Sequence, residues 1–255
     1  MTYSGIFDTH AHYDDEKFSE DRAELLSSLN ESGVIGIIDC GCDRISSLEA
    51  IELSKKFDFV FSAIGIHPHE AAEAKESDYE ELRALYSNPK VVAVGEIGLD
   101  YHYDFSPREV QLEAFERQIV LANELSLPII VHDREAHEDT FSLLKKYRPR
   151  GVVHCFSGSV EMAKEVLKLG MYIGLGGAVT FKNARKPLEV AKAVPNDRLL
   201  LETDCPYMAP VPFRGSRCDS SMISKTAEKI AEVRSCETQE LIDQCRKNAK
   251  ALFGV

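Results

Sequence analysis

The stretch Val91-Val92-Ala93-Val94-Gly95-Glu96 (VVAVGE) is almost continuously apolar and ends on a carboxylate. Such a run is typical of a strand whose two faces are both covered, as in a parallel sheet flanked by helices. Three other stretches have the same character: VIGIID (34–39), PIIVH (128–132) and LLLET (199–203). Together they predict a buried parallel sheet.

Short β-rich runs alternate with longer amphipathic segments along the chain. The predicted strands are Gly5–Thr9, Val34–Asp39, Phe59–Gly65, Val91–Glu96, Pro128–His132, Val152–Cys155, Met171–Leu175 and Leu199–Thr203. The predicted helices between them are Asp21–Asn30, Arg44–Phe57, Asp78–Tyr86, Glu109–Leu125, Ala136–Tyr147, Val160–Leu169 and Ala184–Ala193. Eight strands in this alternation, within 255 residues, predict a (β/α)8 barrel.

Two more helical patterns, Met222–Val233 and Thr238–Phe253, follow the eighth strand after a proline-rich loop. Because no linker, low-complexity stretch or repeat divides the chain, we expect residues 1–255 to form a single domain. The predicted fold is an α/β TIM barrel with an extra C-terminal helix. An open doubly wound sheet is the alternative, but no glycine-rich dinucleotide fingerprint follows the first strand.

The chain is acidic: 30 basic and 42 acidic residues give a formal net charge of −12. That sign disfavours a duplex-binding regulator with a broad basic face, but it allows a nucleic acid held locally by metal ions and a few cations. The sequence shows no signal peptide and no apolar run of membrane length. Seven scattered cysteines indicate reduced thiols. We therefore expect a cytoplasmic protein with no membrane contact.

Side chains that can bind metal stand at the downstream ends of predicted strands. His10 and His12 are alternate residues, so in an extended chain both point to the same side and can reach one ion. In a (β/α)8 barrel the carboxyl ends of the strands meet at one mouth, where functional residues gather. The candidates for this mouth are His10, His12, Glu96, His132, His154 and Asp204. Because so many such residues at strand ends are improbable by accident, the sequence predicts a metal centre.

Six ordered blocks carry a family resemblance, which continues to NAKALF (248–253). They are DTHAHYDD (8–15), GIHPH (65–69), VAVGEIGLDY (92–101), LPIIVHDREA (127–136), VVHCFSGS (152–159) and LLLETDCPYMAP (199–210). In this order they resemble the TatD family of metal-dependent deoxyribonucleases, within the amidohydrolase-like superfamily.

The resemblance implies a dinuclear site that hydrolyses phosphodiester bonds of DNA. His10, His12 and Asp204 would hold one divalent ion. His132 and His154 would hold the second, with Glu96 as the bridge. Two ions about 3.5–4 Å apart lower the pKa of a bound water and stabilise the attacking and leaving oxygens of a phosphoryl displacement. Asp204 would orient or deprotonate that water, so Asp204 and Glu96 are the candidate catalytic residues.

The identity of the metal stays open between Mg²⁺, Mn²⁺ and Zn²⁺. Four histidines among six ligands favour Zn²⁺, Mn²⁺ or a similar transition metal, because Mg²⁺ prefers oxygen ligands. Members of the family are, however, generally described as Mg²⁺-dependent nucleases.

Four residues near the mouth are candidates for substrate binding: His67, Arg134, Lys182 and Arg214. His67 follows the third strand and could donate to a phosphate oxygen or pack beneath the rim, and His69 is a weaker candidate for the same role. The three cations could bind phosphates or remain solvated surface charges. Nearby aromatic residues could stack on bases or simply pack: Tyr101, Tyr103, Phe156 and Phe181.

Three features near the site stand apart from this pattern. Cys40 and Cys42 form a CxC at a strand end and are expected to be buried or semi-buried thiols rather than metal ligands. Asp133 stands where the family often has serine, and could accept a hydrogen bond from a ligand imidazole or, as an extra anion, weaken the binding of a polyanionic substrate. After the eighth strand the family usually carries Arg-Gly-x-Arg-Asn-Glu-Pro, whereas this chain has RGSRCDS (214–220). That change puts the substrate preference in question.

Three functions are compatible with these residues. The favoured one is a 3′-5′ exodeoxyribonuclease that acts as a monomer on DNA, single-stranded rather than duplex, with the direction taken from the family alone. The second is an amidohydrolase-type hydrolase of a small amide, lactone or phosphoester, which the acidic charge and the altered loop would suit. The third is a barrel that has lost catalysis and serves as a scaffold, against which the intact ligand set argues.

Overall fold

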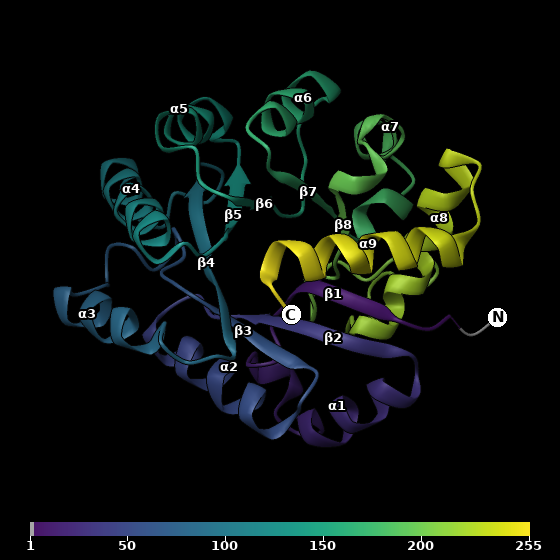
Figure 1. The fold of residues 1–255 in the computed structure, drawn as a ribbon, viewed down its shortest axis with the longest axis horizontal. Helices are drawn as coiled ribbons and strands as arrows, with labels where there is room; N and C mark the ends of the chain where they lie inside the picture. The colour runs from purple at the N-terminus through teal and green to yellow at the C-terminus, as the bar shows by residue number, and fades with distance from the viewer. Residues whose placement is uncertain (1–2) are drawn as a thin grey trace.

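The computed structural model describes residues 3–255, and its central element is one eight-stranded parallel sheet in the order β1 to β8 (Figure 1). The strands are β1 Ile6–Ala11, β2 Val34–Cys40, β3 Val60–Ile64, β4 Val91–Asp100, β5 Ile129–Arg134, β6 Gly151–Val153, β7 Tyr172–Leu175 and β8 Leu199–Leu201. The α-helices are α1 Arg22–Glu31, α2 Arg44–Lys56, α3 Glu76–Leu85, α4 Arg108–Leu125, α5 His137–Tyr147, α6 Val160–Lys168, α7 Arg185–Ala193, α8 Ile223–Arg234 and α9 Thr238–Phe253. The predicted (β/α)8 barrel with an extra C-terminal helix is confirmed.

The sheet closes into a nearly complete barrel just beyond the end of β8. Asp204 N donates to His10 O at 3.0 Å, and His12 N donates to Cys205 O at 2.8 Å. These bonds continue the ladder between β1 and the segment after β8, where Ala11 and Cys205 form a parallel bridge. Residues that were predicted as metal ligands therefore lie on the seam of the barrel.

The barrel has an apolar layer at the amino ends of its strands. Ile130 and Val152 belong to a buried cluster inside the barrel, and His132 and His154 follow two residues later on the same strand faces. The last turns of α9 complete this layer with Ala249, Leu252 and Phe253. Figure 1 shows the C-terminus near the centre of the ring of helices. Because α9 and the apolar layer fill the amino end, the polar residues are confined to the opposite mouth.

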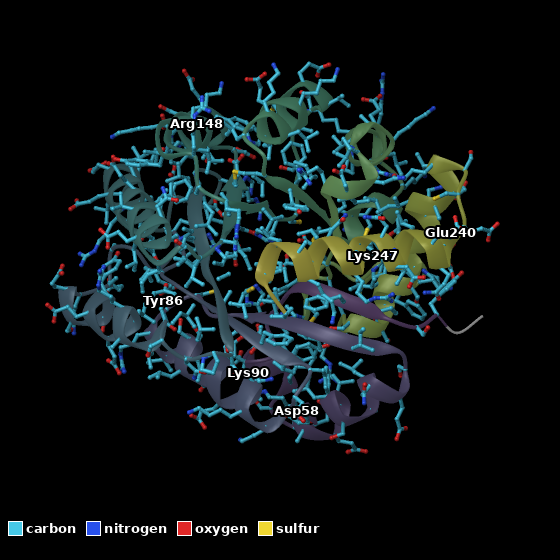
Figure 2. The ribbon with its side chains drawn as sticks, viewed as in Figure 1. Asp58, Tyr86, Lys90, Arg148, Glu240 and Lys247 are labelled. Atoms are coloured by element: carbon cyan, nitrogen blue, oxygen red, sulfur yellow. The ribbon has the colours of Figure 1, made fainter. Side chains whose placement is uncertain are left out.

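Hydrogen bonds hold the segment before β4 against both ends of β3. Lys90 Nζ donates to the carbonyl of Asp58 at 2.6 Å and to that of Val60 at 3.2 Å. Figure 2 labels Lys90, Asp58 and Tyr86. Tyr86 Oη donates to the carbonyl of Ile64 at 2.7 Å. Both ends of β3 are thus hydrogen-bonded to the segment that precedes β4.

One predicted boundary is wrong in a way that matters for the site. The fourth strand does not end at Glu96 but continues to Asp100, and all ten of its residues are buried. The ladder with β5 continues through Leu99–Asp133 and Asp100–Arg134 after an irregularity between Val94 and Ile97. Glu96 therefore projects from within β4, at the irregularity, and Asp100 occupies the strand end.

No helix within residues 3–255 is both long enough and apolar enough to span a membrane.

Candidate metal centre

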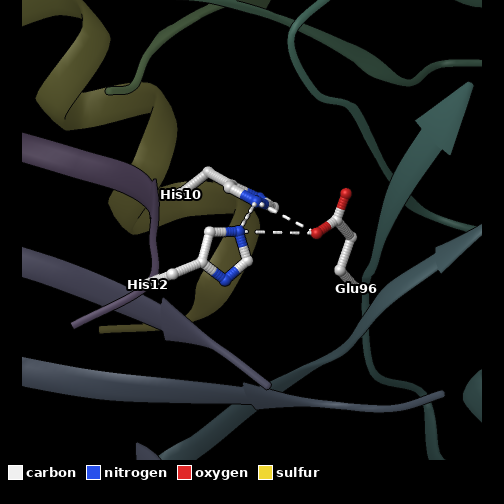
Figure 3. Close-up of side chains that lie close together, drawn as sticks. All are labelled: His10, His12 and Glu96. Carbon is white, nitrogen blue, oxygen red and sulfur yellow. Dashed lines mark hydrogen bonds and ion pairs between the residues drawn. The ribbon is translucent and has the colours of Figure 1, made fainter. Parts of the chain in front are cut away.

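The structure brings all six predicted metal ligands together. Within residues 3–255, three groups offer ligand atoms that lie within 4.8 Å of one another: His10 with His12 and Glu96, His10 with His154 and Asp204, and His67 with Glu96 and His132. The Nε2 atoms of His10 and His12 lie 3.0 Å apart and face Glu96 (Figure 3). The alternation of His10 and His12 on β1 thus places both rings on the same side, as the pattern predicted.

Glu96 lies between two pairs of histidines and offers one oxygen to each. Its Oε2 lies 3.4 Å from His10 Nε2 and 3.6 Å from His12 Nε2. Its Oε1 lies 2.9 Å from His132 Nδ1 and 2.7 Å from His154 Nε2. This division of the two carboxylate oxygens is what a carboxylate bridge between two cations requires.

Two of the imidazoles are oriented by hydrogen bonds on the side away from Glu96. His12 Nδ1 donates to the carbonyl of Cys40 at 2.8 Å, which leaves the lone pair of Nε2 facing the centre. His132 Nε2 lies 3.0 Å from Asp100 Oδ2, and its Nδ1 faces the centre. Such partners fix the tautomer and the ring orientation of metal-binding histidines.

His154 has a different environment, which the sequence did not reveal. Its Nδ1 is buried without a hydrogen-bond partner within residues 3–255, and the nearest carboxylate oxygen is Glu202 Oε1 at 3.8 Å. Burial raises the pKa of Glu202 to about 8, although the charge of His154 acts in the opposite direction. Glu202 Oε1 instead accepts a hydrogen bond from the backbone N–H of Cys155. The only signal in the sequence is that Glu202 is a carboxylate within an otherwise apolar strand.

Asp204 stands at the open side of the centre. Its Oδ1 lies 3.7 Å from His10 Nε2 and 3.5 Å from His12 Nε2. Its side chain is 22 % exposed, compared with 4 % for that of Glu96. The preceding Thr203 donates from both its backbone N and its hydroxyl to the buried Asp8, at 3.0 and 2.6 Å. Asp8 therefore holds the segment that presents Asp204, behind the histidines and not among the candidate ligands.

The charges at the centre suit a cation. Burial would raise the pKa of Glu96, but the neighbouring His154, His10 and His67 outweigh it and hold that pKa well below its usual range. The pKa of Asp204 is lowered as well, because its hydrogen bond with His12 and the charges of His10 and His154 outweigh burial. Burial and the charge of His154 lower the pKa of His10 to about 4. At neutral pH Glu96 and Asp204 are ionised and His10 is neutral, which suits divalent ions. The pKa values of His12, His132 and His154 are raised above the usual range, so these rings must give up a proton when a metal binds.

The predicted substrate-binding residues surround this centre at different depths. His67 is buried, and its Nε2 lies 3.7 Å from Glu96 Oε1, so it belongs to the third ligand group as well as to the rim. Arg134 and Arg214 are exposed and lie over aromatic rings, at 4.7 Å from the centre of Tyr103 and 3.5 Å from that of Phe181. Lys182 is exposed next to Phe181.

Of two expectations near the site, the one for Asp133 is wrong and the one for the buried or half-buried thiols of Cys40 and Cys42 is confirmed. Asp133 does not orient a candidate ligand: it lies 2.7 Å from His137 Nδ1 and accepts from the Thr140 hydroxyl, because its side chain points toward α5. Asp100 fills that role instead, and although it lies within the block VAVGEIGLDY, nothing in the sequence marks it as the partner of His132. Cys40 is buried and Cys42 is half-buried, and Cys40 Sγ lies 3.5 Å from His10 Nδ1, on the side of that ring away from Glu96.

A parallel (β/α)8 barrel with histidines and carboxylates converging at its carboxyl mouth defines the class of metal-dependent barrel hydrolases. The sequence profile of the family described as TatD related DNase matches residues 7–254. The chain belongs to this TatD family, and is a metal-dependent hydrolase acting on ester bonds.

Comparisons with individual proteins agree with this membership. The chain is 45 % identical, over 253 residues, to an uncharacterized metal-dependent hydrolase, YabD, of Bacillus subtilis, covering 98 % of this chain and 99 % of the relative. It is 35 % identical, over 259 residues, to the 3′-5′ ssDNA/RNA exonuclease TatD of Erwinia tasmaniensis, covering 98 % and 100 %. The crystal structure of YJJV, a TatD homolog from Escherichia coli K12, superposes with a TM-score of 0.92 at 33 % identity and 98 % coverage of both chains.

Proposed function

We propose that this protein is a 3′-5′ exonuclease that removes nucleotides from single-stranded DNA with two divalent metal ions. The observation that supports it most directly is Glu96, whose two oxygens face separate pairs of histidines. The name of the Erwinia tasmaniensis relative supports the polarity and the single-stranded substrate.

The residues divide into two ligand sets. We assign His10, His12 and Asp204 to one ion, and His132 and His154 to the other, with Glu96 between them. When bound, a pair of Mg²⁺, Mn²⁺ or Zn²⁺ ions would supply Lewis-acid activation of water and charge stabilisation at the phosphoryl oxygens. All the assigned ligands come from one chain, so we also propose that the monomer is sufficient for activity.

The chain's own groups then orient the substrate and handle the proton. Asp204 is ionised and partly exposed at the open side of the centre, where its carboxylate accepts a proton from the attacking water. His67 Nε2 donates to a phosphate oxygen beside Glu96. Arg134, Lys182 and Arg214 lie around the mouth and bind phosphates farther along the strand.

Arg134 and Arg214 are available for such contacts. Neither guanidinium has a hydrogen bond or an ion pair within residues 3–255, while Arg217 in the same loop as Arg214 is bound to Asp21 through two contacts of 2.7 and 2.5 Å. The altered loop 214–220 therefore offers one arginine to a polyanion and not two.

The test is hydrolysis of a 5′-labelled single-stranded oligonucleotide by metal-stripped protein resupplied separately with Mg²⁺, Mn²⁺ and Zn²⁺. We expect a ladder that shortens from the 3′ end, and slower cleavage of the matching duplex. Asp204→Asn should nearly abolish hydrolysis while some metal stays bound, because Glu96 and the four histidines remain. Near-normal turnover by Asp204→Asn would refute the role of Asp204. Hydrolysis of small amides, lactones or phosphoesters without any cleavage of oligonucleotides would instead establish the amidohydrolase alternative.

A further inference from the structure

Two exposed aromatic rings form a platform beside the metal centre. Tyr103 and Phe105 lie in the loop between β4 and α4, with 47 % and 67 % of their surfaces exposed. The two rings are stacked, with centroids 5.2 Å apart and planes at 22°. We call this pair the aromatic ledge. Two adjacent exposed aromatic rings form an apolar patch, and such patches often mark a binding site.

Hydrogen bonds on both sides of the two rings hold the loop that carries the ledge. Asp100 Oδ1 accepts the backbone N–H groups of His102 at 3.0 Å and Tyr103 at 2.9 Å. Ser106, which is fully buried, donates to the carbonyl of His69 at 3.0 Å and accepts from Ala72 N. The loop is therefore hydrogen-bonded to the barrel before and after the two rings. The rings are exposed in a loop that these bonds hold in place.

The ledge is also linked to a candidate metal ligand. The His69 ring packs edge-on against Tyr103 and Phe105, with centroids 5.5 and 4.8 Å away. His69 Nε2 lies 2.9 Å from Asp100 Oδ2, the same oxygen that lies 3.0 Å from His132 Nε2. The centroids of His69 and His132 are 6.2 Å apart. Stacked nucleotides rise about 3.4 Å each along a strand, so a few nucleotides cover the distance from the centre to the ledge.

The charge around the ledge is favourable to a nucleotide. The guanidinium of Arg134 lies over Tyr103 and is free of carboxylate partners within the described chain. The carboxylate of Asp104, between the two rings in sequence, is bound by Arg108 at 2.7 Å. The exposed Glu135, next to Arg134 in sequence, pairs with His102 at 2.9 Å. Because Asp104 and Glu135 are both paired, the free guanidinium of Arg134 can accept a phosphate.

We propose that the aromatic ledge binds an unpaired nucleobase of the substrate strand, with Arg134 at the neighbouring phosphate. This rests on the proposed exonuclease function and adds the reason for a single-stranded preference. A base in a duplex is already stacked and paired, whereas an unpaired base has a free π-face to place on Phe105. Stacking does not depend on the identity of the base, so the ledge would tolerate any sequence.

The kinetic test uses the metal-loaded protein and the double variant Tyr103→Ala/Phe105→Ala. The matched control is Tyr79→Ala, because Tyr79 on α3 also lies under an arginine, Arg117 at 4.1 Å, but lies between α3 and α4 and not in the loop after β4. On a single-stranded oligonucleotide we expect KM to rise roughly tenfold in the double variant with little change in kcat. On an oligonucleotide with abasic residues at its 3′ end, the difference in KM between the wild type and the double variant should disappear. Phe105→Trp should keep the low KM of the wild type.

A binding test reports the stacking itself. A phosphorothioate-linked oligonucleotide with 2-aminopurine near its 3′ end should lose fluorescence on binding to the metal-loaded wild type and to Tyr79→Ala, and much less on binding to the double variant. Equal KM and equal quenching in the wild type and the double variant would overturn the inference while the exonuclease function stands. A loss of kcat together with bound metal would also overturn it, because the loop would then only support Asp100. A wild type that cleaves no oligonucleotide overturns the proposed function, and the inference with it.

Discussion

The Nδ1 atom of His12 lies 2.8 Å from the carbonyl oxygen of Cys40, on the neighbouring strand. A carbonyl only accepts hydrogen bonds, so this contact fixes the proton on Nδ1 and frees Nε2 for a metal. The orientation of a candidate ligand thus depends on the main chain of β2 and not on the Cys40 side chain.

Cys40→Ala should therefore keep the metal. The carbonyl remains in place after this substitution, so we expect the affinity for Mn²⁺ or Zn²⁺ to fall by less than the roughly tenfold that follows the loss of an orienting partner. Isothermal titration calorimetry on the metal-stripped protein measures it. A much larger loss would mean that the thiol itself, 3.5 Å from His10 Nδ1, contributes to the centre.

In the dinuclear centre that we propose, removal of Glu96 should affect both ions. In Glu96→Ala the two histidine pairs lose their shared carboxylate, so we expect the bound metal to fall from two equivalents to one or none and turnover to fall roughly a thousandfold. Elemental analysis of the purified variant gives the stoichiometry. Glu135→Gln is the control, because Glu135 is an exposed carboxylate that pairs with His102 at 2.9 Å. Two equivalents of metal in Glu96→Ala would contradict the bridging role.

Asp100 and Asp133 form a matched pair for a test of ligand support. Both are paired with histidines, but Asp100 contacts His132 while Asp133 contacts His137. We expect Asp100→Asn to weaken metal binding by about 10–100-fold, and Asp133→Asn to leave it nearly unchanged. Titration of both variants with the same metal gives the two dissociation constants to be compared. Equal effects would show that Asp100 has no special role.

Metal binding should release a proton from His132. Burial lowers the pKa of this histidine, but its hydrogen bonds with Asp100 and Glu96 outweigh burial and raise it to about 9 in the metal-free protein. A metal needs the unprotonated Nδ1, so the proton must leave, and the apparent affinity should fall as the pH drops below about 9. Calorimetry in buffers of different ionisation enthalpy counts the protons. Near pH 7.5 we expect at least one, and fewer in Asp100→Asn, whereas pH-independent affinity would contradict this reasoning.

Phe253 should contribute strongly to stability because it helps to fill the amino end of the barrel. It is 5 % exposed and shares the inner cluster with Phe7. We expect Phe253→Ala to lower the free energy of unfolding by about 3–5 kcal/mol. Lys247→Ala, at an exposed position of the same helix (Figure 2), should change it by no more than about 0.5 kcal/mol. Denaturant unfolding of both variants makes the comparison, and similar values would show that α9 does not seal the barrel.

The sequence predicted the fold well because the strands of a parallel barrel are buried on both faces and leave apolar runs. It predicted the convergence at the mouth for a related reason: His10, His132 and Asp204 follow such runs directly. The end of β4 was misplaced because Glu96 looks like the polar end of a strand, whereas the ladder with β5 continues four residues further to Asp100.

The supporting residues could not be found in the same way. A single carboxylate in the sequence does not reveal its partner, so Asp100 and Glu202 were overlooked and Asp133 was overvalued. Likewise, the availability of an arginine depends on distant residues: Arg217 is bound to Asp21, which is 196 positions away. Contacts of this kind are set by tertiary packing and leave no periodic pattern in the chain.

The packing of α9 against β1 brings together residues that the ribosome adds at the beginning and at the end of synthesis. Phe7 and Phe253 belong to the same buried cluster, and a ribosome that adds about 5–20 residues per second needs roughly 12 to 50 s to pass from one to the other. During that interval the amino end of the growing barrel has no cover, and its apolar side chains face water. The inner packing of the barrel is therefore completed only when the last helix has been made.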